Sequence, residues 1–284
     1  GKMPRASDMH LQGQLLCLMG PAGTGKSQLA MQSPQPHAIL AVDKPVIAPM
    51  PEGFPGYDPN LTFGKLYPPP AKDLTNDKEK PSRNIFDQII QDIQAIKTAL
   101  HKAETSFSLG GETWPLPHTI ILEGMDFVRD HCVNWVLNTQ GKLHMDEFAN
   151  GFLGWGLVAS KMEELMMNLA FLPSIRPVNV IVTIGLDQEK KREKVNGKVE
   201  YVETGNYDPG FGGKMSTEAP RKFRDCWLTQ RVGGAYFVHT AQTPQTAVYR
   251  GLRSGRFGLQ AVEPVTLVKP YMNQWNRLFS NTNT

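Results

Sequence analysis

Short runs of apolar residues recur along the first two thirds of the chain, and each is too short to be a helix. They are Leu15–Met19, His37–Val42, Thr119–Leu122 and Asn179–Ile184. Within each run the apolar residues follow one another with little polar alternation, which is typical of strands that are buried on both faces of a parallel sheet. The pattern therefore predicts a set of buried parallel strands.

Between these runs, apolar positions follow the period of a helix. From Ile85 to Leu100 they recur at spacings of one, three and four, and Ser82 is the expected N-cap. Lys26–Met31 follows a glycine-rich turn and is expected to be helical, while Leu157–Leu172 predicts a further helix rich in Met and Leu. Alternating strands and helices predict an α/β fold with a mostly parallel sheet covered on both faces.

The remaining segments are less regular. Pro45–Pro81 is dominated by Pro, Gly, Asp and Lys, and we expect a long irregular insertion with little helix. Asn196-Gly197 lies between alternating residues in Lys194–Val202, which predicts a β-hairpin, and Gly205–Ser216 is expected to be a loose loop. Short strands that extend the sheet, with antiparallel pairing, are expected at Asp225–Leu228, Ala235–Thr240 and Thr246–Tyr249.

Length and composition fit one ordinary folded domain. Of the 284 residues, 40% are hydrophobic and 20% are charged, and no stretch of about 18 apolar residues predicts a membrane-spanning helix. We expect a flexible segment over residues 1–12, a single domain over 13–270 that contains the insertion at 45–81, and a tail over 271–284. Three scattered cysteines (Cys17, Cys132 and Cys226) fit a reducing, cytoplasmic setting without a zinc site.

The strongest chemical signal is the segment GPAGTGKS, which matches the pattern G-x-x-x-x-G-K-[ST] of a phosphate-binding loop. A chance match is the alternative, but an apolar strand precedes this segment and a helix follows it, as a phosphate loop requires. The predicted nucleotide-binding residues are Gly20, Pro21, Ala22, Gly23, Thr24, Gly25, Lys26, Ser27 and Gln28. In such a loop, backbone N–H groups surround phosphate oxygens, Lys26 reaches the β- and γ-phosphates, and the Ser27 hydroxyl binds Mg²⁺. ATP and Mg²⁺ are therefore the expected cofactors.

A phosphate loop needs an acidic partner at the end of a neighbouring buried strand. Glu123 follows Thr119–Leu122 and is the first candidate for holding the metal, although it could also merely end the strand. Asp126 is expected to share that role or to activate the attacking water, and Asp43 ranks third. Thr183, near the end of another strand, is either a sensor of the γ-phosphate or an ordinary strand residue.

Two groups of basic residues suggest further functions. Arg250, Arg253 and Arg256 are three apart, and one of them, for which we choose Arg253, is expected to reach the phosphates of a neighbouring subunit. The alternative is a solvated basic turn. In the second group, the mobile loop with Lys214, followed by Arg221 and Lys222, is expected to contact single-stranded DNA, unless it is only a solvated surface. The expected stacking faces there are Tyr201, Tyr207 and Phe211, and the basic residues of the preceding hairpin are Lys190, Lys191, Arg192, Lys194 and Lys198.

Taken together, the order of these segments resembles the phage-type RecA-like P-loop ATPases, the group of single-strand annealing and recombination ATPases of bacteriophages. The matching segments are GPAGTGKS (20–27), AILAVD (38–43), TIILEGMD (119–126), NVIVTI (179–184), GFGGKM (210–215), FRDCW (223–227), YRGLRSGR (249–256) and Glu263-Pro264. Only the first is specific. The chain departs from the family in having Glu123 where Asp is usual, in having Lys44-Pro45 in place of a glutamate, and in its long insertion.

The resemblance implies a RecA-like core that binds ATP and Mg²⁺ and assembles into a ring or filament. It also implies action on single-stranded DNA in phage recombination, replication or repair, with phage recombination or replication proteins as partners, in the cytoplasm of an infected bacterium and without a membrane. The first two departures predict slow hydrolysis, or hydrolysis that depends on DNA or a neighbouring subunit. The alternatives are a P-loop kinase of a small molecule, whose arginine lid would be residues 250–256, and a nucleotide-gated assembly protein without DNA binding.

Overall fold

The structure is a computed structural model that describes residues 13–42, 50, 53–54, 57–72, 84–195, 198–254, 259–267 and 273–279. At its centre is an eight-stranded sheet with the order β12-β11-β10-β1-β7-β6-β2-β3. The strands of this sheet are β1 (Leu15–Met19), β2 (His37–Val42), β3 (Thr62–Tyr67), β6 (Thr119–Glu123), β7 (Asn179–Ile184), β10 (Asp225–Val232), β11 (Ala235–His239) and β12 (Val262–Val265).

Most of the sheet is parallel. Strand β1 pairs in parallel with β7 on one side and β10 on the other, and the ladder continues in parallel through β6, β2 and β3. The pairings of β10 with β11 and of β11 with β12 are antiparallel, so β11 alone runs opposite to the other strands of the sheet. The predicted α/β core with a mostly parallel sheet, and with antiparallel pairing added at the C-terminal side, is therefore confirmed.

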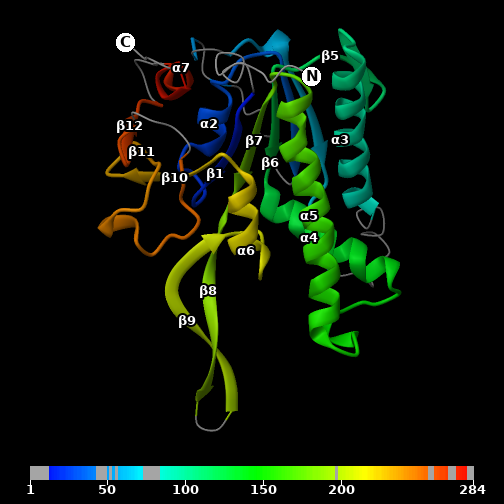
Figure 1. Cartoon of the computed structure of the whole chain (residues 1–284), viewed down its shortest axis with the longest axis vertical. Coiled ribbons are helices and arrows are strands. Elements are labelled where there is room, and N and C mark those ends of the chain that lie inside the picture. Colours follow the sequence, from blue (N-terminus) through cyan, green and yellow to red (C-terminus); the bar gives the residue numbers. More distant parts are fainter. Residues whose placement is uncertain are drawn as a thin grey trace, which may run out of the picture.

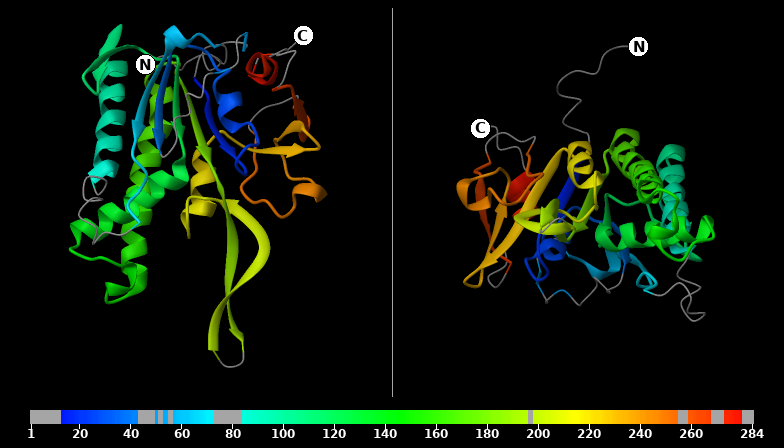
Figure 2. Two further views of the ribbon diagram at one scale, coloured as in Figure 1. Left: turned by 180° about the vertical axis from the view of Figure 1, so that it is seen from behind. Right: turned by 90° about the horizontal axis from the view of Figure 1, so that it is seen from below.

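Helices cover both faces of the sheet, as Figures 1 and 2 show. The helices α3 (Ile85–Lys102), α4 (Met125–Thr139) and α5 (Gly151–Ile175) pack on one face, and α2 (Lys26–Ala30) and α7 (Gln274–Phe279) pack on the other. Strand residues alternate between the two cores: Cys17 and Met19 face the first, and Leu16 and Leu18 face the second. This two-sided burial is why the strands read as continuous apolar runs in the sequence.

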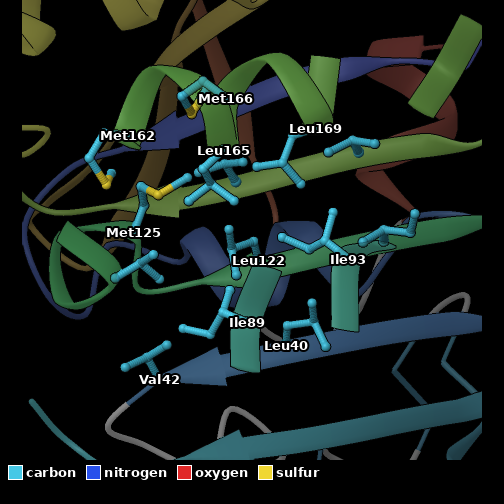
Figure 3. Close-up of a cluster of buried hydrophobic side chains, with 14 of the residues drawn as sticks. Leu40, Val42, Ile89, Ile93, Leu122, Met125, Met162, Leu165, Met166 and Leu169 are labelled. Atoms are coloured by element: carbon cyan, nitrogen blue, oxygen red, sulfur yellow. The ribbon is translucent and has the colours of Figure 1, made fainter. Parts of the chain in front are cut away.

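The larger core holds the strands against α3 and α5. Leu40 and Leu122 from the sheet lie among Ile89 and Ile93 of α3 and Leu165 of α5, all at 0–1% exposure (Figure 3). Each such side chain contributes roughly 1.5–3 kcal/mol through removal from water. The strand ends that carry the predicted chemistry are thus fixed by packing on either side.

One part of the molecule projects away from the sheet. Strands β8 (Leu186–Val195) and β9 (Lys198–Pro209) form a separate antiparallel hairpin that extends downward in Figure 1, beside the first half of α5. The expected hairpin is confirmed and is longer than expected, with residues 196–197 outside the described residues. A turn then leads into α6 (Met215–Glu218), so Gly205–Ser216 is not one loose loop.

Several expectations about the irregular segments were wrong. The insertion at 45–81 contains β3, which joins the main sheet beside β2, and its mixed exposure explains why no apolar run marks it. Thr246–Tyr249 is not a strand, and the outermost strand is β12 instead. Strand β12 contains Pro264, which is tolerated because it lies at the edge of the sheet, where a missing N–H interrupts no ladder.

Other features were not expected from the sequence. They include α4, the long start of α5, and the small hairpin of β4 (Ser106–Leu109) and β5 (Glu112–Pro115). The N-cap of α3 is Asn84, whereas the expected cap Ser82 lies outside the described residues. In the segment expected to be a C-terminal tail, Trp275 and Leu278 of α7 are buried in the second core. Among the described helices, none has the length and apolarity needed to cross a membrane.

Candidate functional site

The loop at Gly20–Ser27 connects the end of β1 to the start of α2, as predicted. A Cβ atom at Gly20, where φ is 150°, would lie 2.5 Å from the carbonyl oxygen of Thr229, so no side chain fits there. Gly25 has a φ of 89°, in the left-handed region that favours glycine. The tight turn that opens the loop toward a ligand therefore depends on these two glycines.

Side chains hold the loop in this shape. The Thr24 hydroxyl donates to the Pro21 carbonyl at 2.8 Å and lies 2.7 Å from the Thr229 hydroxyl of β10. Thr229 also donates to the Met19 carbonyl at 3.3 Å. Because Thr24 and Thr229 are buried, these hydrogen bonds are shielded from water and fix the loop before any ligand arrives.

Lys26 points back across the mouth of this loop. Its ammonium group donates to the carbonyl oxygens of Gly20 at 2.8 Å and Pro21 at 2.7 Å, and it makes no ion pair with any described residue. Burial lowers the pKa of Lys26, while the negative charges of Glu123 and Asp126 oppose that shift. A half-buried cation held only by neutral carbonyls is suited to receive an anion.

Glu123 lies beside the loop at the end of β6, two strands away from β1. Ser27 donates its hydroxyl to Glu123 Oε1 at 2.6 Å, and Glu123 Oε2 is buried without a hydrogen-bond partner among the described residues. Burial raises the pKa of Glu123, and the hydroxyls of Ser27 and Thr183 and the charge of Lys26 only partly oppose this. The cost of burial therefore outweighs the hydrogen bonds and the charge of Lys26 that favour the ionised form of this acid.

A second acid, Asp126, occupies the first turn of α4 beside Glu123. Its Oδ1 accepts the Gly185 N–H at 3.4 Å, and burial raises its pKa. Thr183 accepts the Gly124 N–H at 3.1 Å, so it ties the end of β7 to the end of β6. The structure therefore brings both predicted acids and Thr183 to the phosphate loop, while Asp43 lies outside the described residues.

These groups line one cavity of about 720 Å³, a size typical of small-ligand sites. The cavity runs from Glu123 and Asp126, past the phosphate loop, to Arg231 and Tyr236. All the predicted loop residues line it except Thr24, which is buried behind the loop. The oxygen donors Ser27 Oγ and Glu123 Oε1 and Oε2 suit Mg²⁺, which binds to one or two protein oxygens and completes its shell with phosphates and water.

Arg231 and Tyr236 were not identified from the sequence. They lie opposite each other on β10 and β11, one pair before a turn at Gly233 and Gly234, both of which have positive φ. The Arg231 guanidinium lies 5.2 Å from the centre of the Tyr236 ring. The signal that could have found them is the Gly-Gly pair between two short strands, which indicates a two-residue hairpin and fixes its register.

The predicted arginines are not found at the cavity. Arg253 bridges through its backbone to Cys226 and donates from Nη1 to the Arg221 carbonyl at 3.3 Å. Arg250 forms an ion pair with Glu189 at the base of the hairpin, and Arg256 lies outside the described residues. Neither Arg250 nor Arg253 is among the described residues that line the cavity of this chain.

The residues expected to contact DNA are on the surface around α6. Lys214 is 78% exposed and pairs with Glu218, while Lys222 pairs with Glu163. Arg221 is exposed. The projecting hairpin is not basic as a whole, because residues 186–209 contain five Lys or Arg and six Asp or Glu.

Of the aromatic residues expected to stack on bases, not all are exposed in the structure. Phe211 is 1% exposed and packs against Phe223, so it cannot stack on a base, whereas Tyr201 is 71% exposed. Tyr207 stacks on Tyr249. A second cavity, of about 690 Å³, borders the glycine-rich segment Gly210–Met215. Its lining includes Lys214 of that segment and the exposed rings of Phe152 and Trp155 on α5.

A network of hydrogen bonds joins this surface to the first cavity. The Gly210 N–H donates to the carbonyl of Gly185, the residue that also donates to Asp126. Arg129 of α4 donates to the Gly210 carbonyl at 2.9 Å and to Asp187 of β8 at 2.5 Å. The base of the hairpin is therefore fixed to the helix that carries Asp126.

A family model described as an AAA domain matches residues 12–220. No curated protein is detectably similar in sequence. A solved structure described as the RadB recombinase shares 12% identity and a TM-score of 0.39, with alignment over 90% of this chain and 89% of that one. Similarity at this level carries no functional information.

Proposed function

The chain belongs to the AAA domain family, and on that premise we propose that it binds Mg²⁺–ATP at Gly20–Ser27 and hydrolyses it. One observation carries this proposal: the Ser27 hydroxyl lies 2.6 Å from Glu123 Oε1, inside the cavity that Lys26 enters. Residues from a phosphate loop and from a strand two positions away would not meet in this way in a chance glycine-rich loop.

Each side chain has a role that follows from its position. The loop N–H groups and Lys26 bind the phosphates, and Ser27 and Glu123 would hold Mg²⁺, which neutralises charge on the β- and γ-phosphates when bound. Asp126 orients and deprotonates the attacking water, since burial raises its pKa toward that of a useful base. Thr183 holds the ends of the two neighbouring strands at the γ-phosphate position.

We also propose that hydrolysis is coupled to single-stranded DNA at the surface around Gly210–Met215. The network through Arg129 and Gly185 supports this, because hydrogen bonds connect Asp126 to Gly210 through Gly185. Lys214, Arg221 and Lys222 would contact phosphates. The exposed rings of Phe152 and Trp155 would replace Phe211 as faces on which bases stack.

Assembly into a ring or filament is part of the same proposal. Because Arg253 does not line the cavity of its own subunit, we propose that it acts on the nucleotide of a neighbour. Arg253→Ala would then lower hydrolysis only at protein concentrations where the chain assembles. The phage-infected bacterial cytoplasm, with recombination or replication proteins as partners, is the setting that we propose for this activity.

The kinase alternative loses its main support in this structure. An arginine lid would have to reach the phosphates of its own subunit, yet neither Arg250 nor Arg253 is among the described residues that line the cavity. A nucleotide-gated assembly protein differs from our proposal only in lacking hydrolysis and DNA binding, so activity measurements separate the two.

The proposal is tested by measuring ATP hydrolysis with and without single-stranded DNA for the wild type, Lys26→Ala and the control Lys102→Ala, which changes an exposed lysine of α3. We expect DNA-stimulated hydrolysis in the wild type and the control, and a loss of at least about 100-fold in Lys26→Ala. Nucleotide binding without hydrolysis would favour the assembly protein. Turnover that requires a small-molecule acceptor would favour the kinase.

A further inference from the structure

The nucleotide cavity has two chemically different ends, and this asymmetry orients the ligand. Glu123 and Asp126 lie at one end, across β7 from the phosphate loop. Arg231 and Tyr236 lie at the other end, on the opposite side of β1. Because Ser27 and Glu123 would hold the Mg²⁺ that neutralises the terminal phosphates, the γ-phosphate belongs at the acidic end. The nucleoside must then extend toward the hairpin of β10 and β11.

The hairpin places a cation and an aromatic ring at that end by its backbone geometry. Its two-residue turn at Gly233 and Gly234 sets Arg231 directly opposite Tyr236 in the antiparallel ladder. Side chains of directly opposed residues project from the same face of a hairpin, and here that face borders the cavity. The guanidinium consequently lies over the ring at 5.2 Å from its centre.

We propose that the base of the bound nucleotide stacks on the ring of Tyr236, with the Arg231 guanidinium on the other face of the base. This inference rests on the proposed binding of ATP at the phosphate loop. Both groups have the planar faces that stacking on a base requires, and no metal or covalent step is involved.

The surroundings of the two side chains allow such a clamp. The Tyr236 ring packs on the phosphate loop, because a Cβ atom added at Gly25 would lie 3.2 Å from ring atom Cδ1. The ring is therefore adjacent to the loop that holds the phosphates. Inserting a base requires the two planes to separate to about 7 Å, twice a normal contact distance. Arg231 is exposed and has a long flexible stem, so its guanidinium can move away from the ring far enough to admit a base.

The competing explanation is that Tyr236 only supports the loop from the outside, together with Leu267, which is also close to Gly25. In that case, removing the ring would disturb phosphates and base alike. A clamp instead predicts that only ligands with a base lose affinity. Inorganic tripolyphosphate with Mg²⁺ separates the two explanations because it carries the phosphates without the nucleoside.

The experiment is calorimetric measurement of the dissociation constants of Mg²⁺–ATP and Mg²⁺–tripolyphosphate for the wild type and four variants. The variants are Tyr236→Ala, Tyr236→Phe, Arg231→Ala and the control Tyr201→Ala, which removes an exposed tyrosine ring of the β8–β9 hairpin. We expect Tyr236→Ala to weaken ATP binding about 10- to 100-fold, as loss of one stacking face does, and Arg231→Ala to weaken it less. Tyr236→Phe and Tyr201→Ala should bind ATP as the wild type does, and tripolyphosphate affinity should be unchanged in all.

The possible failures are distinguishable. If the wild type binds neither ligand, the proposed function fails. If the wild type binds both and Tyr236→Ala binds ATP equally well, the clamp alone is refuted. Equal weakening of ATP and tripolyphosphate in Tyr236→Ala would make the ring a support for the loop and would also refute the clamp.

Discussion

The loops at Gly20–Ser27 and Gly210–Met215 are both rich in glycine and carry lysines, yet they use their charges differently. In the first, Lys26 is half-buried and donates hydrogen bonds to two neutral carbonyls, beside the buried carboxylate of Glu123. In the second, Lys214 is exposed and already paired with Glu218. A half-buried charge that forms no ion pair with any described residue indicates a ligand, whereas an exposed ion pair contributes little to stability and indicates little about function.

The difference also concerns rigidity. Buried hydroxyls of Thr24 and Thr229 fix the first loop from within. The second loop depends on contacts at its start, where Arg129 and Gly185 bind Gly210. We infer that the first region is a preformed binding site and that the second responds to it, and the following changes test this division.

The largest effect is expected from Glu123→Gln. The amide keeps the size of the side chain and can accept the Ser27 hydrogen bond, but it loses the negative charge that would hold Mg²⁺. We expect hydrolysis to fall by about 100- to 1,000-fold, as for other losses of one electrostatic group. Nucleotide binding should fall much less. Steady-state hydrolysis and calorimetric binding, measured side by side, check this.

Glu123→Gln, which should lower hydrolysis, is expected to raise the stability of the folded protein. Burial raises the pKa of Glu123 in the folded protein above its pKa in the unfolded chain. As the pH rises above the pKa of the unfolded chain, ionisation of Glu123 therefore lowers the stability of the folded protein. The Gln variant removes that cost. Its melting temperature without nucleotide should exceed that of the wild type at neutral pH, and the difference should shrink toward acidic pH. A lower melting temperature throughout would show that Glu123 is not a strained buried acid.

The division between the two regions also explains what the sequence could predict. The phosphate loop was predictable because its glycines are required by backbone geometry, and the buried strands because burial on both faces leaves only apolar residues. Strands β3 and β12 lie at the two edges of the sheet, where one side is open and polar residues or Pro264 are tolerated. Their sequences therefore carry no such signal.

The sequence predicted less of the surface around Gly210–Met215. Phe211 lies in a glycine-rich segment and could have been exposed, but its burial against Phe223 is decided by the packing of α6 onto α5. Phe152 and Trp155 could not be placed beside that loop, because they are about 60 residues away in sequence. Arg231 and Tyr236 were missed for a similar reason, since only the register of their hairpin pairs them.

An intermediate effect is expected from Arg129→Ala, which removes the connection between the two regions. Arg129 is 18% exposed and its loss leaves Asp187 and the Gly210 carbonyl without this donor. We expect DNA stimulation of hydrolysis to fall by about tenfold, and folding stability to fall by about 1.5–3 kcal/mol per lost charged hydrogen bond. Hydrolysis without DNA should remain near the wild-type rate.

Arg129→Lys is the matched variant, because it keeps the charge but cannot reproduce the guanidinium, which contacts Asp130 through Nε and Nη2 while Nη1 donates to Asp187 and to the Gly210 carbonyl. It should recover part of the stability and little of the stimulation. If Arg129→Ala lowered hydrolysis equally with and without DNA, the residue would support the nucleotide cavity itself, and the proposed coupling through Gly210 would be wrong.

The smallest effect is expected from Lys214→Ala, because one exposed phosphate contact changes binding only modestly. We expect single-stranded DNA affinity to fall a few-fold, and its dependence on salt to decrease by roughly 0.7 in logarithmic slope. ATP affinity should not change. Glu218→Gln is the informative partner: if Lys214 must leave Glu218 to reach DNA, removing that acid strengthens DNA binding, whereas a purely structural ion pair predicts no gain. Opposite effects of the two variants would show that a charge paired in the free protein is nevertheless part of the binding surface.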